Sequence, residues 1–389
     1  MLRSWNDFGV SIFSIMTEEA NKAGAINLAQ GFPDFDGPAE VIQEAVAALK
    51  NGFNQYSPSS GLRDLRLSIG HYVERRRNLK YDPDTQISIF SGATEALFCA
   101  VMACCKDKDE LLTFEPFFDI YPGFAFAAGA SFKTIMLNAP HWDFDASILE
   151  KAICPKTRVI LLNTPNNPTG KVFSSEELQQ IAALAIKHDL IVITDEVYEE
   201  VVFEPNEHVC IAQLPAMKER TIVISSASKT FSLTGWKVGY ALGPEKLITQ
   251  LRKIHEHIVF CAATPLQKAA IKAYYLPDCY FDKLRSDYKQ KKEFLLKALV
   301  NAGFRCFDPQ GSYFIIADYS ALSDLNDLDF SLWLTREIKL ACIPLSAFFQ
   351  DKEMMSSKHL VRFCFAKTFD TLMASAERLQ NLRKLSEKK

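Results

Sequence analysis

The sequence predicts an α/β fold with a large domain, in which a mostly parallel mixed sheet lies between helices, and a smaller α+β domain. The chain has 389 residues, which is long enough for two domains. In its middle part, short apolar runs alternate with helical patterns. This alternation is typical of a sheet with helices on both faces. After about residue 280 the pattern changes to long charged helices and short strands, which indicates the second domain.

Six short apolar runs are the predicted strands of the large domain. Runs this apolar suit strands that are covered on both faces, as in a parallel or mixed sheet. They lie at residues 87–90, 110–114, 158–162, 190–193, 221–224 and 238–242.

Helices are predicted between these runs. Ser174 and Glu177 have the spacing of a capping box, which opens a helix that runs through His188. Residues 92–105 directly follow a strand and form a second predicted helix. Residues 38–50 form a third, which begins with a proline near its first turn and ends at an Asn-Gly pair.

The smaller domain is expected to combine the C-terminal part of the chain with the N-terminal segment. A helix near residues 13–23 fits against either domain by sequence alone. We place the large domain at 41–280 and the small domain at 1–40 and 281–389. The predicted elements of the C-terminal part are helices at 281–300, which Gly303 closes, 329–339 and 368–385, and strands at 313–317 and 360–365.

Composition argues against several classes of partner. The formal net charge of −3 gives no reason to expect nucleic acid or an acidic membrane surface. The longest apolar run, 96–105, is far shorter than the roughly 20 residues that span a bilayer. The ten cysteines form no CxxC pair, and His255 and His257 point to different sides of a helix, so no metal is expected. With no signal peptide apparent at the start, we expect a cytoplasmic protein.

Two lysines follow the strand at 221–224, in the segment SSASKTFSLTGWKVGY (225–240). A partly desolvated lysine such as Lys229 can lose its proton and form a Schiff base with an aldehyde. Its small neighbours leave room for a bulky cofactor, while Ser226 and Lys237 suit a phosphate. Pyridoxal 5′-phosphate, a phosphorylated aldehyde, fits these features. The structural alternative is that Lys229 caps a helix and Lys237 is solvent-exposed.

Asp195 lies at the carboxyl end of the strand at 190–193 and is followed closely by Tyr198. The pyridine nitrogen of such a cofactor needs a carboxylate to stay protonated. A buried aspartate in turn needs a partner. The Tyr198 phenol suits a hydrogen bond to the O3′ oxygen of the ring. The alternative for Asp195 is a helix N-cap.

Two turns follow other predicted strands. Asn167 lies in NTPNNPTG (163–170), where a neutral amide suits the same O3′ oxygen, although Asn, Pro and Gly also make plain turns. Gly92 leads a strand into a helix, whose free N–H groups suit a phosphate. Neither a Walker A loop nor a GxGxxG motif is present.

The last two candidates are an aromatic segment and an arginine. Phe118 lies in EPFFDIY (115–121), from which one ring can stack on a pyridine face or pack in the core. Arg362 lies inside the apolar strand at 360–365, where it needs a partner. A substrate carboxylate or a structural salt bridge would supply one. These segments end strands of one predicted sheet, where α/β proteins bind ligands.

The blocks QGFPDF, NTPNNPTGKVF, TDEVYE, SASKTFSLTGWKVGY and VRFCFAK together resemble class I aminotransferases of the fold-type I pyridoxal-phosphate family. The resemblance covers residues 25–367 and is nearest to the kynurenine, glutamine and methionine aminotransferase branch. It implies a pyridoxal-phosphate transferase fold, a homodimer with shared active sites, and transfer of an amino group from an L-amino acid to a 2-oxo acid.

The resemblance also implies a role for each candidate residue. Lys229 carries the Schiff base and acts as general base and acid, Asp195 pairs with the ring nitrogen, and Tyr198 and Asn167 hold O3′. The phosphate is bound by Gly92, Ala93, Thr94, Ser226, Lys237 and the partner's Tyr56, and Phe118 stacks on the ring. The substrate is bound by Arg362, Asn167, Gly31, Phe13 and, from across the dimer, Phe260.

Two positions depart from relatives of the kynurenine type. Phe13 stands where they often have tryptophan, and Cys261 where they often have histidine. Both changes shrink or depolarise the side-chain pocket, so methionine or phenylalanine is at least as plausible a donor as kynurenine.

Two other functions are compatible with parts of this pattern. A cysteine-conjugate or cystathionine β-lyase uses the same carbanion but expels a leaving group from Cβ. A regulator built on an aminotransferase domain usually carries an additional N-terminal DNA-binding domain, for which a QGFPDF block at residue 30 leaves no room.

Overall fold

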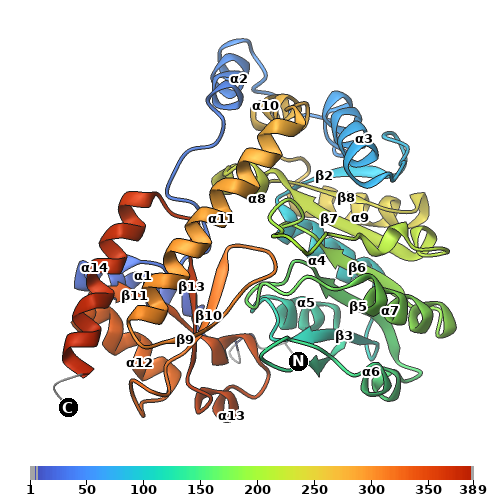
Figure 1. Cartoon of the computed structure of the whole chain (residues 1–389). Helices are drawn as coiled ribbons and strands as arrows, with labels where there is room; N and C mark the ends of the chain where they lie inside the picture. Colours follow the sequence, from blue (N-terminus) through green and yellow to red (C-terminus); the bar gives the residue numbers. More distant parts are fainter. Residues whose placement is uncertain (1–4, 6–7, 387–389) are drawn as a thin grey trace.

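The computed structural model describes residue 5 and residues 8–386, and a seven-stranded sheet forms the centre of its larger part (Figure 1). The strand order is β2-β8-β7-β6-β5-β3-β4. Only β8 runs antiparallel to its neighbours, so the sheet is mixed and mostly parallel, as predicted. The strands are β2 (Ile87–Ser91), β3 (Glu110–Glu115), β4 (Ser131–Met136), β5 (Thr157–Asn163), β6 (Ile191–Asp195), β7 (Thr221–Ser226) and β8 (Val238–Leu242).

The six predicted strands are all present, and β4 is an addition. β4 pairs only with β3, at the end of the sheet order, and most of its residues are half-exposed. A strand at an edge does not need to be apolar on both faces. Its sequence, SFKTIM, therefore lacks the unbroken apolar run that marked the other six.

Helices cover both faces of the sheet, and side-chain alternation along β5 decides which core each residue joins. Val159 and Leu161 pack into the cluster under one helical layer, whereas Ile160 and Leu162 pack into the cluster on the opposite face. This is the two-residue period of a strand that is buried on both sides. The first layer contains α4 (Ala93–Cys104), α5 (Tyr121–Ala128) and α9 (Glu245–Ile258). The opposite face is covered by α3 (Arg63–Arg77), α6 (Ala146–Ala152), α7 (Ser175–Lys187) and α10 (Thr264–Tyr274), with α2 (Ala39–Lys50) packed on α10.

The predicted start of α7 is confirmed in detail. The Ser174 hydroxyl accepts a hydrogen bond from the Glu177 amide at 3.2 Å, and the Glu177 carboxylate accepts one from the Ser174 amide at 2.9 Å. These two bonds satisfy amide groups that have no partner within the helix.

The C-terminal part contains a second, antiparallel sheet with the order β12-β13-β10-β9. Its strands are β9 (Arg305–Phe307), β10 (Phe314–Asp318), β12 (Ile343–Pro344) and β13 (Leu360–Cys364). The surrounding helices are α11 (Asp278–Asn301), α12 (Asp327–Trp333), α13 (Lys352–Ser356) and α14 (Phe369–Ser386). The helix predicted at 329–339 begins slightly earlier and ends in a π-helical turn, Leu334–Ile338.

The N-terminal segment packs beside this C-terminal part. β1 (Ile26–Asn27) pairs in parallel with β11 (Leu340–Ala341), and α1 (Ile12–Ala23) lies next to them (Figure 1). We propose the division into a large domain, 41–280, and a small domain, 1–40 with 281–389. One apolar cluster crosses that boundary, because Met16 and Ile343 share it with Ile160 of the large sheet.

No helix of the described part of the chain is both long and apolar enough to span a bilayer. The cytoplasmic location stays a prediction.

Candidate active site

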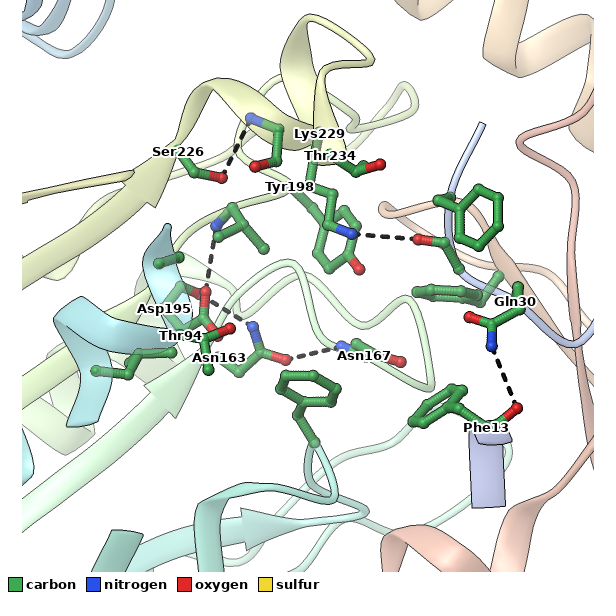
Figure 2. A pocket seen from close by; sticks show the side chains of 18 of the residues that line it. Phe13, Gln30, Thr94, Asn163, Asn167, Asp195, Tyr198, Ser226, Lys229 and Thr234 are labelled. Carbon is green, nitrogen blue, oxygen red and sulfur yellow. Dashed lines mark hydrogen bonds between the residues drawn. The ribbon is translucent and has the colours of Figure 1, made fainter. Parts of the chain in front are cut away.

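A cavity of about 350 Å³ lies at the carboxyl ends of the central strands, between the large sheet and the C-terminal part (Figure 2). Nearly all of the candidate residues line it, although they come from segments far apart in the chain. Those lining the cavity are Phe13, Gly31, Ala93, Thr94, Phe118, Asn167, Asp195, Tyr198, Ser226, Lys229, Lys237 and Arg362.

Lys229 reaches this cavity from α8 (Ala227–Thr230), a short helix that follows β7 and is capped by Ser226. Its amine donates a hydrogen bond to the carbonyl oxygen of Gly31 at 3.2 Å. Burial lowers the pKa of the Lys229 amine to about 8. A lysine with such a pKa is partly neutral near physiological pH and can act as a nucleophile or base.

Asp195 ends β6 and is almost completely buried. Its Oδ2 accepts a hydrogen bond from the Tyr121 hydroxyl at 2.8 Å, and its Oδ1 accepts a long one from the Val197 amide at 3.4 Å. Burial raises the pKa of Asp195 to about 6, against the effect of the Tyr121 hydrogen bond. The ionised carboxylate would therefore be stabilised by a positively charged partner in the cavity.

Asn163 and Asn167 connect Asp195 to Arg362. The Asn163 amide donates to the Asp195 carbonyl at 3.0 Å and accepts from the Asn167 backbone at 2.8 Å. Asn167 Oδ1 then accepts from Arg362 Nη1 at 2.7 Å. Sequence reasoning did not assign roles to Asn163 or Tyr121. The signal for Asn163 was its place directly after an apolar strand, as for Asp195.

Arg362 is fully buried within β13 of the second sheet, so the expectation that all candidate segments end strands of one sheet is wrong for this residue. Its Nη2 donates to the Ala29 carbonyl at 2.8 Å, and its guanidinium lies 4.0 Å from the ring centre of Phe314. Nε has no hydrogen-bond partner, and no described carboxylate forms an ion pair with this side chain. Burial lowers the pKa of Arg362 to about 10. The guanidinium is thus oriented by neutral groups and available to an anion in the cavity.

A second anion-binding corner forms around Gly92, which is the N-cap of α4 with a φ of 86°. Gly239 on β8 passes directly beneath this turn, where an added Cβ would lie 2.4 Å from the Ala93 nitrogen. The Lys237 side chain packs against the same turn, about 3 Å from where a Gly92 Cβ would be. With Thr94 and Ser226 nearby, the corner offers helix N–H groups, hydroxyls and a cation.

Aromatic residues form the remaining walls. Tyr198 is buried, and burial raises the pKa of its phenol, so the hydroxyl stays protonated. Phe118 lies beside the cavity and contacts Tyr121 edge-to-face at 5.8 Å between ring centres. Phe13 enters from α1, with its ring centre 5.2 Å from the Arg362 guanidinium. The cavity thus has an anion-binding corner at Gly92 and, apart from it, the Arg362 guanidinium surrounded by aromatic rings.

Tyr56 and Phe260 do not line the cavity. They lie on the surface, 82% and 42% exposed, and pack against each other at 5.3 Å between ring centres. Cys261 is next to them, in a separate surface hollow with Tyr56. Roles for these three residues in the pocket stay predictions that require a second chain.

One group of side chains has the spacing of a metal site: Glu196, Glu199 and His208. Each is already occupied by protein contacts. Glu196 bonds to His208 at 2.8 Å, while Glu199 accepts hydrogen bonds from three hydroxyl groups. These contacts favour a buried hydrogen-bond network over an ion site.

Comparisons with known proteins agree with this geometry. The profile of the family "Aminotransferase class I and II" matches residues 23–379. The methionine aminotransferase of Escherichia coli is 37% identical, with 96% of each chain covered. The human kynurenine–oxoglutarate transaminase 3 is 38% identical and covers 93% of this chain and 86% of its own length.

Comparison with a solved structure also identifies an aminotransferase fold. The N-succinyldiaminopimelate aminotransferase of Mycobacterium tuberculosis superimposes with a TM-score of 0.95 at 38% identity, covering 98% of this chain and 99% of its own. The fold is that of the fold-type I aminotransferases, as the sequence predicted. The chain belongs to the class I and II aminotransferase family, and it is an enzyme of the transaminase class that acts on amino acids and 2-oxo acids.

Proposed function

We propose that the cavity binds pyridoxal 5′-phosphate and that Lys229 is the residue to which its aldehyde is joined. The observation that carries this proposal is a buried lysine, with its pKa lowered to about 8, in one cavity with Asp195 and the anion corner at Gly92. The described residues fit the cofactor at both of its polar ends. The corner suits a phosphate, and the buried Asp195 carboxylate suits a protonated ring nitrogen.

When bound, pyridoxal 5′-phosphate supplies an aldehyde that reacts with amines and a ring that accepts the electron pair left on the substrate's α-carbon. The chain's own residues bind and move protons around it. Asp195 keeps the ring nitrogen protonated, and Tyr198 and Asn167 hydrogen-bond the ring oxygen. Phe118 packs on the ring face. Lys229 takes the α-proton of the amino acid as general base and later donates it as general acid.

Arg362 is proposed to bind the substrate α-carboxylate, together with Asn167 and the backbone at Gly31. Its two terminal nitrogens are already aimed by Asn167 and Ala29, so the guanidinium plane is fixed before substrate arrives. A fixed guanidinium loses little entropy when it binds a carboxylate bidentately.

The proposed amino donor has an apolar, thioether or aromatic side chain, with methionine and phenylalanine ahead of kynurenine and glutamine. Phe13, Phe32 and Phe314 line the cavity, and the ring centres of Phe13 and Phe314 lie 5.2 and 4.0 Å from the Arg362 guanidinium. The described lysines and arginines of the lining are Lys229, Lys237 and Arg362, and each already has a proposed role. No described cation of the lining is therefore left for a carboxylate on the substrate side chain.

The test is a panel of amino donors assayed with several 2-oxo acids. Methionine and phenylalanine should react faster than kynurenine, with ping-pong kinetics because the amino group is transferred in two half-reactions. Faster turnover of kynurenine would contradict the role given to Phe13. The β-lyase alternative is not favoured by the relatives described above, which are named as aminotransferases or transaminases. Pyruvate release without an added 2-oxo acid would support it.

A homodimer with shared active sites is proposed from a set of exposed apolar side chains. Tyr56 and Phe260 pack against each other on the surface, the chain neighbour of Phe260, Val259, is exposed as well, and so are Leu49 and Phe53. Large exposed apolar side chains that cluster on a surface favour an interface with another protein. In the dimer, Tyr56 is proposed to reach the phosphate and Phe260 the substrate of the partner subunit.

A further inference from the structure

Three segments meet at the carbonyl oxygen of Gly31. Lys229 Nζ donates to this oxygen at 3.2 Å, and the Tyr313 hydroxyl donates to it at 2.7 Å. Gly31 belongs to the N-terminal segment and Lys229 to α8, and Tyr313 immediately precedes β10. A carbonyl oxygen has two lone pairs, so these two donors use both.

Tyr313 is held rigidly in this position. It is fully buried, and its ring packs edge-to-face on Tyr198 at 5.0 Å between centres. Its backbone carbonyl accepts from the Phe365 amide at 3.0 Å. Burial raises the pKa of the Tyr313 phenol, so the hydroxyl remains a donor across the working pH range.

The backbone at Gly31 is fixed on its other sides as well. A Cβ at Gly31 would lie 2.8 Å from the Phe314 ring, so the close packing here depends on glycine. Two residues earlier, the Ala29 carbonyl accepts from Arg362 at 2.8 Å. Residues 29–31 therefore present one carbonyl to the substrate-binding arginine and one to the lysine.

We propose that Tyr313 is a positioning residue for proton transfer: its hydroxyl orients the Gly31 carbonyl, which holds the Lys229 amine while that amine takes and returns the α-proton. This inference rests on the proposed role of Lys229. As the neutral amine accepts the proton from the substrate α-carbon, it becomes an ammonium group with three N–H bonds. One of these points at Gly31, which fixes the direction of the others.

The orientation effect concerns the rate of proton transfer and not the binding of substrate. Tyr313 is absent from the cavity lining, and it touches the lysine only through Gly31 and through its ring, whose centre lies 6.0 Å from Nζ. A Tyr313→Phe variant keeps the ring and loses only the hydroxyl. Misplacement of a catalytic group by about 1 Å can slow a reaction by roughly 100-fold.

The experiment compares Tyr313→Phe with Tyr274→Phe. Tyr274 is also fully buried, but its hydroxyl has no hydrogen-bond partner, so its removal isolates the effect of losing a buried phenol oxygen. For Tyr313→Phe we expect kcat to fall by about 10- to 100-fold with KM for the amino donor nearly unchanged. The isotope effect with an α-deuterated donor should rise, since proton transfer becomes slower. Tyr274→Phe should match the unmodified protein in both measurements.

A second measurement uses the cofactor-free protein. With glycine labelled by carbon-13 at the carbonyl, the Gly31 resonance should move upfield in Tyr313→Phe, because a lost hydrogen bond increases the shielding of a carbonyl carbon. An unmoved resonance, or an unchanged kcat and isotope effect in Tyr313→Phe, would overturn the inference. Full activity in Lys229→Ala would instead overturn the proposed function, so the two failures are distinguishable.

Discussion

Tyr121 Oη donates a hydrogen bond of 2.8 Å to Asp195 Oδ2, and both side chains are buried. The two residues are 74 positions apart in the chain, and Tyr121 belongs to α5 while Asp195 ends β6. Val197 N, at 3.4 Å, is the other hydrogen-bond donor to this carboxylate among the described groups. Tyr121 is therefore the principal group that orients the proposed partner of the cofactor's ring nitrogen.

We predict that Tyr121→Phe moves the acidic limb of the pH–rate profile to higher pH. Burial already raises the pKa of Asp195 to about 6, and the Tyr121 hydrogen bond lowers it, so its loss lets the pKa rise further. Since Asp195 must be ionised to pair with a protonated ring nitrogen, activity is lost at a higher pH than before. A hydrogen bond to a charged group contributes about 1.5–3 kcal/mol, so the midpoint should rise by about one pH unit or more.

Tyr81→Phe is the matched control for this profile, because the Tyr81 hydroxyl is buried without a hydrogen-bond partner. Its acidic limb should coincide with that of the unmodified protein. A Tyr121→Phe profile that also coincides would show that Asp195 does not depend on this contact.

Arg362→Lys should lower kcat/KM for the amino donor by at least about 30-fold, mainly through a higher KM. The lysine keeps the charge but loses the planar pair of donors that Asn167 and Ala29 orient, and loss of a buried, hydrogen-bonded charge pair costs about 2–5 kcal/mol. The control is Arg305→Lys, an exposed arginine paired with Asp318 at 2.6 Å, which should change kcat/KM by less than about twofold. Equal effects in both variants would remove Arg362 from substrate binding.

Gly239→Ala should weaken binding of pyridoxal 5′-phosphate about tenfold. An added Cβ would lie 2.3 Å from the Gly92 carbonyl carbon, so the turn at the anion corner must shift. Overpacking of this kind costs about 1–3 kcal/mol. Gly235→Ala is the control, since a Cβ there meets nothing within 4 Å. Cofactor affinity is measured by absorbance titration, with circular dichroism to verify folding. Equal affinities in the two variants would mean that this turn does not hold the phosphate.

Mixing two inactive variants tests the shared active sites. Lys229→Ala and Tyr56→Ala are each expected to lose most activity. If Tyr56 acts in the site of the partner subunit, a mixed dimer contains one intact site, and random reassociation should restore about a quarter of the unmodified activity. Recovery should follow the fraction of mixed dimers. If Tyr56 acts within its own chain, no mixture regains activity.

Sequence patterns predicted most of the fold because buried strands carry a strong local signal. Residues 159–162 and 190–193 are apolar on both faces, so the sequence predicts β5 and β6 nearly to their ends. The half-exposed edge strand β4 lacks that signal. The sequence also leaves undecided which domain α1 packs against. That choice depends on the pairing of β1 with β11, which is more than 300 residues away in the chain.

The sequence likewise predicts those site residues that carry a strong local signal. Lys229, Asp195 and Arg362 stand out because a charged residue next to or within a buried strand requires an explanation, and all three line one cavity. Tyr121 and Tyr313 did not stand out, because a tyrosine in an apolar segment is ordinary core composition. Their hydroxyl contacts to Asp195 and Gly31 arise only from tertiary packing.

The most direct test of this account is to trap the proposed bond between Lys229 and pyridoxal 5′-phosphate. The loaded enzyme is reduced with borohydride, digested, and its peptides are weighed by mass spectrometry. We predict that the cofactor's mass appears on the peptide that contains Lys229, and that Lys229→Ala carries no such label and does not turn over amino acids. A label on a different lysine, or transamination by Lys229→Ala at the unmodified rate, would contradict the account.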